Sequence, residues 1–270
     1  MTFASIKVSA PPRNFAQEGG HWYTKTGEPM YEVVGANGKT RPTTIRDARK
    51  LGLVPSVSTI LKLEAKPQLT QWLVNQGMLA CLTLPRLAGE NDTVFIKRAL
   101  EDSKQQAIKA AERGKQIHGS IENAMLVGAV QQDGNEKFVK PVFEYIHDTF
   151  PGYIWNPEAS FAYRTPPAGK WYGGKRDLPG THPENRPVII DYKCKDFEAG
   201  TDKQLAWDEH VTQLAAYGQV YAAEFSAVNI FVSTRDAGVF VPVNWSQPEI
   251  ESGWEAFRAL LDLWYARNEL

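Results

Sequence analysis

An apolar run that ends in two charged residues constrains this chain more than any other feature. Residues 187–193 read Pro-Val-Ile-Ile-Asp-Tyr-Lys. Such a run predicts a buried β-strand, in which successive side chains point to opposite faces. Asp191 and Lys193 then share one face, while Ile190 and Tyr192 share the other. Because charge at the end of a buried strand is costly unless it is paired or bound to a metal, the pattern predicts a functional site here.

A second acid lies fourteen residues upstream of Asp191. It is Asp177, in the segment Gly-Gly-Lys-Arg-Asp-Leu of residues 173–178. The stretch between the two acids contains prolines, a glycine and an asparagine that are typical of a turn. Two acids and a lysine at the ends of paired strands suit metal-assisted attack on a phosphodiester.

The composition limits the kinds of site that the chain can build. Its 270 residues are 43% hydrophobic and 23% charged, which predicts one large domain or one core with an appended lobe. The two cysteines, Cys81 and Cys194, have no metal-binding spacing and exclude a disulfide framework or a four-cysteine iron–sulfur cluster. The net charge of −1 argues against coating nucleic acid with the whole surface, but it allows a local basic groove.

No stretch approaches the roughly 18 consecutive apolar residues of a membrane span. The first residues lack the basic start and apolar core of a signal peptide. We therefore expect an intracellular protein without a membrane partner.

Apolar spacing and turn residues divide the chain into three parts. Residues 1–54 predict a β and loop arm, residues 55–128 a helical lobe, and residues 129–270 a core with a C-terminal helix. The expected class is α/β, with a central mixed β-sheet flanked by helices. The expected helices start after Ser56 and cover 69–82, 92–126, 137–149, 207–223 and the segment after the capping box at 246–249. The expected strands are 153–163, 171–178, 187–193, 228–233 and 238–243.

Further candidate site residues lie on the predicted helices and on one strand. Gly114, His118 and Glu122 recur every fourth residue on one helix face. A lone helix histidine more often packs or caps, but the downstream acids favour an active-site role. Gln213 and Tyr217 share a face of the helix after the lysine strand and can present an amide and a phenol to a phosphate or base.

Glu158 begins a predicted strand, where a glutamate is usually solvated, and it is a further candidate. Basic residues near the motifs would neutralise phosphates and make affinity for nucleic acid depend on salt. Aromatic residues among them could stack on unpaired bases, although aromatics in strands more often belong to a core. The basic residues are Lys104, Lys109, Arg113, Lys115, Lys170, Lys175, Arg176, Lys193, Lys195 and Lys203, and the aromatic ones are Trp155, Tyr163, Trp171 and Tyr172.

The order and spacing of these motifs resemble the PD-(D/E)XK nuclease superfamily, and within it the RecB-like exonucleases. The segment from Pro55 to Leu61, followed by Trp72, is also similar to the start of the helical lobe in mitochondrial genome maintenance exonucleases and many phage exonucleases. The resemblance spans roughly residues 55–225. The matching pieces are Gly114 to His118, the G-x-x-D motif at 174–177, the D-x-K motif at 191–193 and the Q-x-x-x-Y motif at 213–217.

This resemblance implies a restriction-endonuclease-like core and a metal-dependent DNA exonuclease that acts on ends, with a preference for single strands, in recombination, repair or replication. It implies that Asp177 and Asp191 bind Mg²⁺ or Mn²⁺ with His118 and the backbone carbonyl of Tyr192. Lys193 would orient or deprotonate the attacking water. The residues that would contact DNA or support the metal ligands are Gln213, Tyr217, Glu158, Glu122, Lys115, Lys175 and Arg176.

Arg176 departs from the family pattern, which has proline or an apolar residue before the first acid. It is either a local phosphate contact or a sign that the strand ends early. Two other functions stay open: an endonuclease on the same fold, and a catalytically silent nucleic-acid-binding module. The retained acids disfavour the silent module, because negative charge beside phosphate does not help a binder. The expected partners are DNA and a recombination protein. The expected compartment is the cytoplasm of a bacterial or phage-infected cell.

Overall fold

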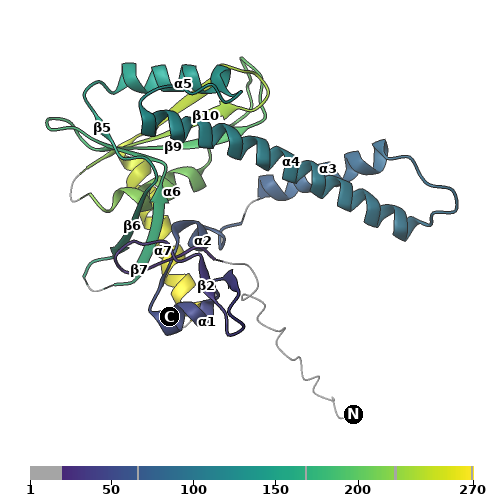
Figure 1. Ribbon diagram of the computed structural model, residues 1–270, viewed down its shortest axis with the longest axis horizontal. Helices are drawn as coiled ribbons and strands as arrows, with labels where there is room; N and C mark the ends of the chain where they lie inside the picture. Colours follow the sequence, from purple (N-terminus) through teal and green to yellow (C-terminus); the bar gives the residue numbers. More distant parts are fainter. Residues whose placement is uncertain (1–19, 66, 168, 222–223, 269) are drawn as a thin grey trace, which may run out of the picture.

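The computed structural model describes residues 20–65, 67–167, 169–221, 224–268 and 270. Its central sheet consists of β5 (Ile154–Trp155), β8 (Leu178–Thr181), β9 (Val188–Lys195), β10 (Ser226–Ser233) and β11 (Phe240–Trp245). The strand order is β11-β10-β9-β8-β5 (Figure 1). Strands β9 and β10 are parallel and the other neighbours are antiparallel. The expected α/β class with a mixed sheet is thereby confirmed.

Helices cover both faces of this sheet (Figure 1). On one face, α4 (Asp92–Val127) and α5 (Glu136–Thr149) pack on the side of β9 that carries Ile190. On the other face, α6 (Asp208–Gly218) and α7 (Gln247–Asn268) share a core with Ile189. A strand buried on both faces reads as a continuous apolar run, which explains why residues 188–190 lack polar positions.

Two expected strands are divided in the structure. The first becomes β5 and β6, the second becomes β7 and β8, and the β6–β7 hairpin forms a separate sheet. The bounds are Ala159–Arg164 for β6 and Trp171–Arg176 for β7. Both breaks lie side by side, because the backbone N–H of Glu158 donates to the carbonyl of Asp177 at 2.9 Å. Alternating side chains do not reveal such a change of sheet, so the single-strand predictions were wrong there.

The expected helix over 207–223 also differs, since α6 ends at Gly218 and residues 222–223 lie outside the described residues. The N–H of Tyr221 donates to the carbonyl of Gly218 at 2.9 Å and closes a turn. The Phe225 ring fills the space beside Gly218. One half of the capping box expected at the last helix is present, because the Glu249 carboxylate accepts the backbone N–H of Ser246, and it also accepts the Ser246 hydroxyl.

The N-terminal segment packs against the core, and residues 1–19 of the expected arm lie outside the described residues. Trp22 is buried, and its ring lies 6.0 Å from that of Trp264 in α7. A helix that the sequence reading missed, α1, begins after Thr44, whose side chain and that of Asp47 form a reciprocal cap. The elements are β1 (Trp22–Tyr23), β2 (Glu32–Val34), β3 (Thr40–Pro42), α1 (Ile45–Leu51), β4 (Val54–Pro55) and α2 (Val57–Leu61).

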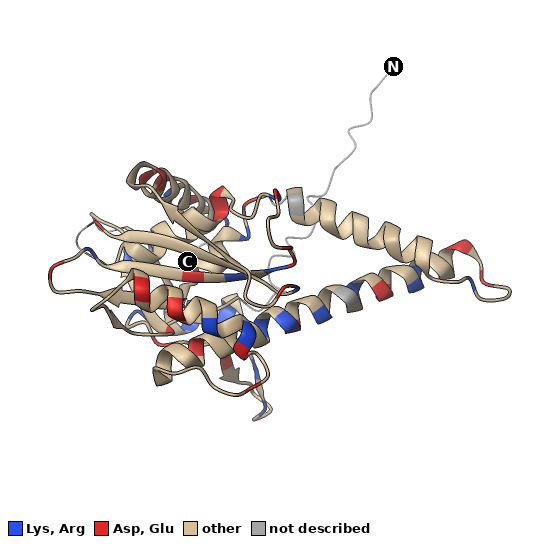
Figure 2. Cartoon of the chain, turned by 90° about the horizontal axis from the view of Figure 1, so that it is seen from above, with Lys and Arg blue, Asp and Glu red and all other residues tan. Residues whose placement is uncertain are grey.

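A two-helix hairpin projects from this body (Figures 1 and 2). Helix α3 (Pro67–Thr83) carries no charged residue and packs on the N-terminal half of α4. Figure 2 shows Lys and Arg residues along α4 on the stretch that leads from the projection to the body. The other half of α4 belongs to the core, where Ile117 and Ile121 are fully buried.

None of the helices in the described part of the chain is both long and apolar enough to cross a membrane.

Candidate active site

Strand β9 places Asp191 and Lys193 on one face, as the alternation predicts. The Lys193 ammonium lies 2.8 Å from Oδ1 and 2.6 Å from Oδ2 of Asp191, and only 2% of the Asp191 side chain is exposed. Burial lowers the pKa of Lys193, but the charges of Asp191 and Asp177 outweigh it, so the pKa is raised overall. The pair is thus a buried carboxylate held against a charged lysine.

Two residues of the neighbouring strands complete the environment of Asp191, and the sequence reading missed both. Asn229 of β10 donates from Nδ2 to Oδ2 of Asp191 at 2.8 Å. Trp245 of β11 donates from Nε1 to Oδ1 of Asn229 at 2.8 Å. Asn229 is completely buried. The available signal was a single amide inside the apolar run of residues 227–232, where an unpaired polar side chain would be costly.

Asp177 lies beside Asp191 on the adjacent strand, at the break between β7 and β8. The antiparallel register pairs Leu178 with Ile190, and one further step along it brings the two acids together. Oδ2 of Asp177 accepts the backbone N–H of Tyr192 at 3.0 Å. Burial and the nearby Asp191 raise the pKa of Asp177 to about 6, although His118 and Lys193 act in the opposite direction. The expected pairing of acids across two strands is therefore present.

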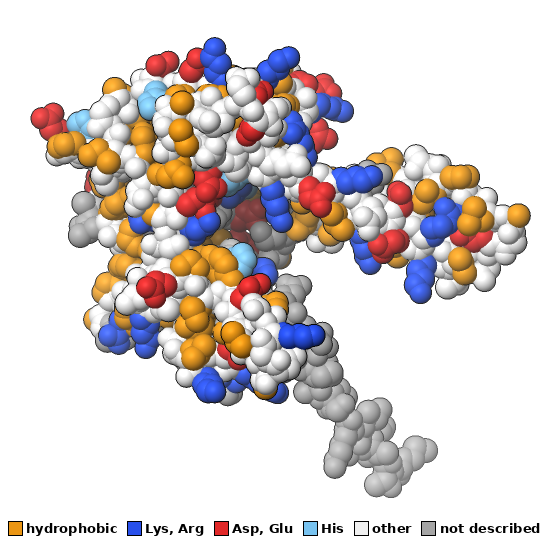
Figure 3. All heavy atoms as spheres, in the orientation of Figure 1, with side chains coloured by type: hydrophobic (Ala, Val, Ile, Leu, Met, Phe, Trp, Pro, Cys, Tyr) orange, Lys and Arg blue, Asp and Glu red, His pale blue; other side chains and the backbone are white. Residues whose placement is uncertain are grey.

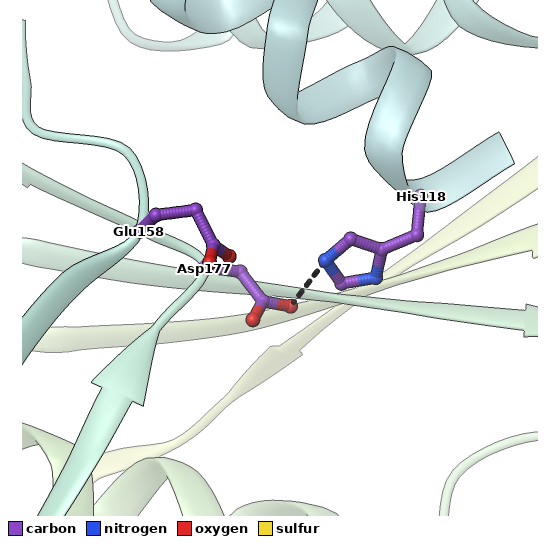
Figure 4. Close-up of side chains that lie close together, drawn as sticks. All are labelled: His118, Glu158 and Asp177. Carbon is purple, nitrogen blue, oxygen red and sulfur yellow. Dashed lines mark ion pairs between the residues drawn. The ribbon is translucent and has the colours of Figure 1, made fainter. Parts of the chain in front are cut away.

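His118 and Glu158 lie around Asp177 (Figure 4). His118 Nε2 is 3.5 Å from Oδ2 of Asp177, and one potential ligand atom from each of the three residues lies within 4.8 Å of the others. Glu158 does not begin a strand as expected; it precedes β6 in a turn with φ of 59°. A left-handed conformation is unfavourable for a residue with a side chain, and here it directs a carboxylate toward Asp177. Lys175 forms an ion pair with this carboxylate.

Helix α4 brings His118 to the sheet through close packing on β9. A Cβ atom at Gly114 would come within 3.3 Å of Cβ of Cys194, so the glycine permits this approach, as expected from its position one turn before the histidine. The His118 ring meets the Tyr192 ring edge to face at 5.6 Å. The neighbouring Ile117 is fully buried. The histidine is therefore held by core packing at the edge of the site.

The remaining predicted site residues lie at different distances from the acids. Gln213 donates from Nε2 to the hydroxyl of Tyr217 at 2.9 Å, which confirms that the two share a helix face. Burial raises the pKa of Tyr217, as do the charges of Asp191 and Asp177. Burial raises the pKa of Tyr192, and the charge of Glu122 adds a smaller effect in the same direction, but the cluster of His118, Glu158 and Asp177 does not include Glu122. Lys115 is exposed on α4.

One expected base-stacking residue has another role. Tyr172 is completely buried, and its hydroxyl donates to the carbonyl of Ala216 at 2.8 Å. It therefore belongs to the core between β7 and α6 and cannot contact a base. Trp155 stacks on Tyr153, with 5.7 Å between their ring centres.

The donor atoms around Asp177 fit a hard divalent cation. One imidazole nitrogen and two carboxylates converge, and the third acid, Asp191, lies beside them. Oxygen-rich sets of this kind suit Mg²⁺ or Mn²⁺. Figure 3 shows a hollow on this face of the molecule, between the part that contains α4 and α5 and the part that contains α1 and β2. Acidic and basic side chains both lie in and around this hollow.

No protein-family model and no curated protein matches the chain. Among solved structures, one described as "Crystal structure of SSO0001" aligns with a TM-score of 0.32 and 12% sequence identity. The alignment covers 72% of this chain and 86% of that chain. A likeness at this level carries no conclusion about function.

Proposed function

We propose that this protein is a Mg²⁺- or Mn²⁺-dependent deoxyribonuclease with a PD-(D/E)XK core, which degrades DNA from its ends. The observation that carries the proposal is the position of Asp177 beside Asp191, with Lys193 bound to the second acid. The order of elements around them supports it: α4 is followed, after α5 and the short strand β5, by β6, by β7 with β8, and by β9, and then by α6 and β10. That order resembles the helix, three strands, helix and strand of a restriction-endonuclease-like core.

Each charged residue has a distinct part in this proposal. Asp177, Asp191, His118 and the carbonyl of Tyr192 hold the cation, and Glu158 supports them from the adjoining turn. When bound, a hard divalent cation supplies activation of water and stabilisation of charge on the phosphate. Lys193 is held as an ammonium by Asp191 and orients the attacking water near the phosphate. Asn229 donates to Oδ2 of Asp191 from the other neighbouring strand, so the carboxylate cannot rotate freely.

The proposed setting follows the same resemblance. DNA ends, with single strands preferred, are the substrate, and recombination, repair or replication is the process. A recombination protein is the further partner, and the cytoplasm of a bacterial or phage-infected cell is the compartment.

Cleavage assays on two forms of DNA test the proposal. End-labelled linear DNA, single-stranded and duplex, and closed circular DNA are incubated with the protein and Mg²⁺, Mn²⁺ or EDTA. We expect metal-dependent loss of linear DNA and intact circles. Cutting of circles would instead indicate an endonuclease. A folded protein that cleaves neither form with either metal would refute the proposal and favour a silent binding module.

A further inference from the structure

Arg176 is a charged residue in an unusual environment at the end of β7. It is only partly exposed, and it directly precedes Asp177. No described residue provides it with a carboxylate or hydrogen-bond partner, and its Nε is a buried donor without an acceptor. A buried charge without a partner is costly. The chain therefore keeps a cation here that its own described residues do not neutralise.

Several other arginines of the described chain have the partner that Arg176 lacks. Each of these guanidinium groups lies within 3.0 Å of a carboxylate oxygen or of the oxygen of a side-chain amide. These pairs are Arg41 with Asp47, Arg86 with Asp92, Arg98 with Glu90, Arg113 with Asn135, Arg186 with Glu224, Arg235 with Glu198 and Arg258 with Glu255.

Aromatic rings hold the Arg176 side chain in place. Its guanidinium carbon lies 5.3 Å from the centre of the Phe161 ring and 5.6 Å from that of Tyr221. The Phe161 ring also contacts Tyr217 edge to face at 5.8 Å. A guanidinium that stacks on aromatic rings still presents its N–H groups along the edge. The two rings thus hold the guanidinium group near the helix that carries Gln213 and Tyr217.

We propose that Arg176 binds a phosphate group of the nucleic-acid strand at this site. The inference rests on the proposed nuclease function. A phosphate oxygen pair matches the planar fork of an arginine, which can donate two parallel hydrogen bonds. Lys175, one residue earlier on the strand, is already paired with Glu158, so Arg176 is the cation next to the first acid that has no carboxylate partner among the residues the structure describes. Here the resembled family has an uncharged residue, so this contact is specific to the chain.

Binding in EDTA tests the contact without any cleavage. The affinity for a single-stranded oligonucleotide is measured by fluorescence anisotropy across a range of salt concentrations. Each phosphate contact contributes about 0.7 to the slope of log affinity against log salt for a single strand. Arg176→Gln should lower the slope by about this amount and weaken binding. Arg46→Gln makes the same change at an exposed position on α1 and should leave both unchanged.

A second measurement covers the case in which Arg176→Gln does not fold. Phenylglyoxal modification of arginines in the wild-type protein is followed by mass spectrometry with and without the oligonucleotide. We expect the strand to slow modification of Arg176 but not of Arg46. A folded Arg176→Gln variant with the wild-type slope and affinity, or unchanged modification of Arg176 under saturating oligonucleotide, would overturn the phosphate contact alone. A wild-type protein that binds no DNA would overturn the proposed function as well.

Discussion

Asn229 provides the most direct test of how the buried acid is held. Its amide accepts from Trp245 and donates to Asp191, both at 2.8 Å, and the residue is completely buried. Asn229→Ala removes one hydrogen bond to a charged group, which contributes about 1.5–3 kcal/mol, and one between neutral groups, which contributes about 1 kcal/mol. The expected loss in the free energy of unfolding is therefore about 3 kcal/mol. Trp245→Phe removes the indole donor and should cost about 1 kcal/mol.

Urea unfolding of both variants and of the double variant separates this network from general packing. If the indole acts through Asn229, Trp245→Phe should cost less in the Asn229→Ala background, with a coupling of about 1 kcal/mol. The slope of unfolding free energy against urea should stay the same, since the surface exposed on unfolding is nearly unchanged. Strict additivity of the two substitutions, or a loss below about 0.5 kcal/mol for Asn229→Ala, would refute the reasoning.

Three further predictions concern the chemistry, the pH dependence and the packing. Asp191→Asn should abolish metal-dependent cleavage of linear DNA while circular dichroism shows a folded protein, because the buried carboxylate loses its charge; Glu255→Gln on the surface of α7 should be as active as the wild type. Burial lowers the pKa of His210 to about 4, assisted by Lys195 and Lys193. Below about pH 6.5 this histidine is therefore protonated in the unfolded chain but still neutral in the folded one. The free energy of unfolding should fall by up to about 3 kcal/mol between pH 6.5 and 4. Gly174→Ala would place a Cβ 2.8 Å from the Phe161 ring and 2.9 Å from the Tyr217 ring, and should cost about 1–3 kcal/mol, whereas Gly119→Ala has open space and should be neutral or stabilising.

Each of these three predictions has a result that would contradict it. Full cleavage by Asp191→Asn would remove this acid from the proposed site. His210→Gln cannot titrate, so it should show a flatter pH profile in urea unfolding than the wild type, and an identical profile would exclude His210 as the cause. Equal melting temperatures for Gly174→Ala and Gly119→Ala would show that the rings beside Gly174 move aside without cost.

Local patterns were sufficient for pairs of site residues that lie close together on one regular element. The run before Asp191 predicted a strand with the acid and Lys193 on one face, and the structure confirms it. A spacing of four residues predicted that Gln213 and Tyr217 share a helix face, and the hydrogen bond between their side chains confirms it. Both follow from periodic backbone geometry, in which a strand repeats every two residues and a helix returns to the same face after four.

The failures lie where the chain leaves regular geometry. Glu158 was predicted to begin a strand, yet it occupies a turn with positive φ, stabilised by a hydrogen bond to a residue nineteen positions later. The long strand expected to end at residue 178 changes sheets at Asp177. Such breaks depend on the partner that each backbone group finds, and that partner is remote in sequence.

The sequence by itself therefore determined the α/β class, the main helices and the face shared by Asp191 and Lys193, because these depend on local periodicity and burial. Tertiary structure alone decided that Glu158 joins His118 and Asp177, that Asn229 and Trp245 hold the buried acid, and that Arg176 lies without a carboxylate partner among the described residues. Those relations join residues on different strands and helices. They are set by sheet register and packing, which no local pattern encodes.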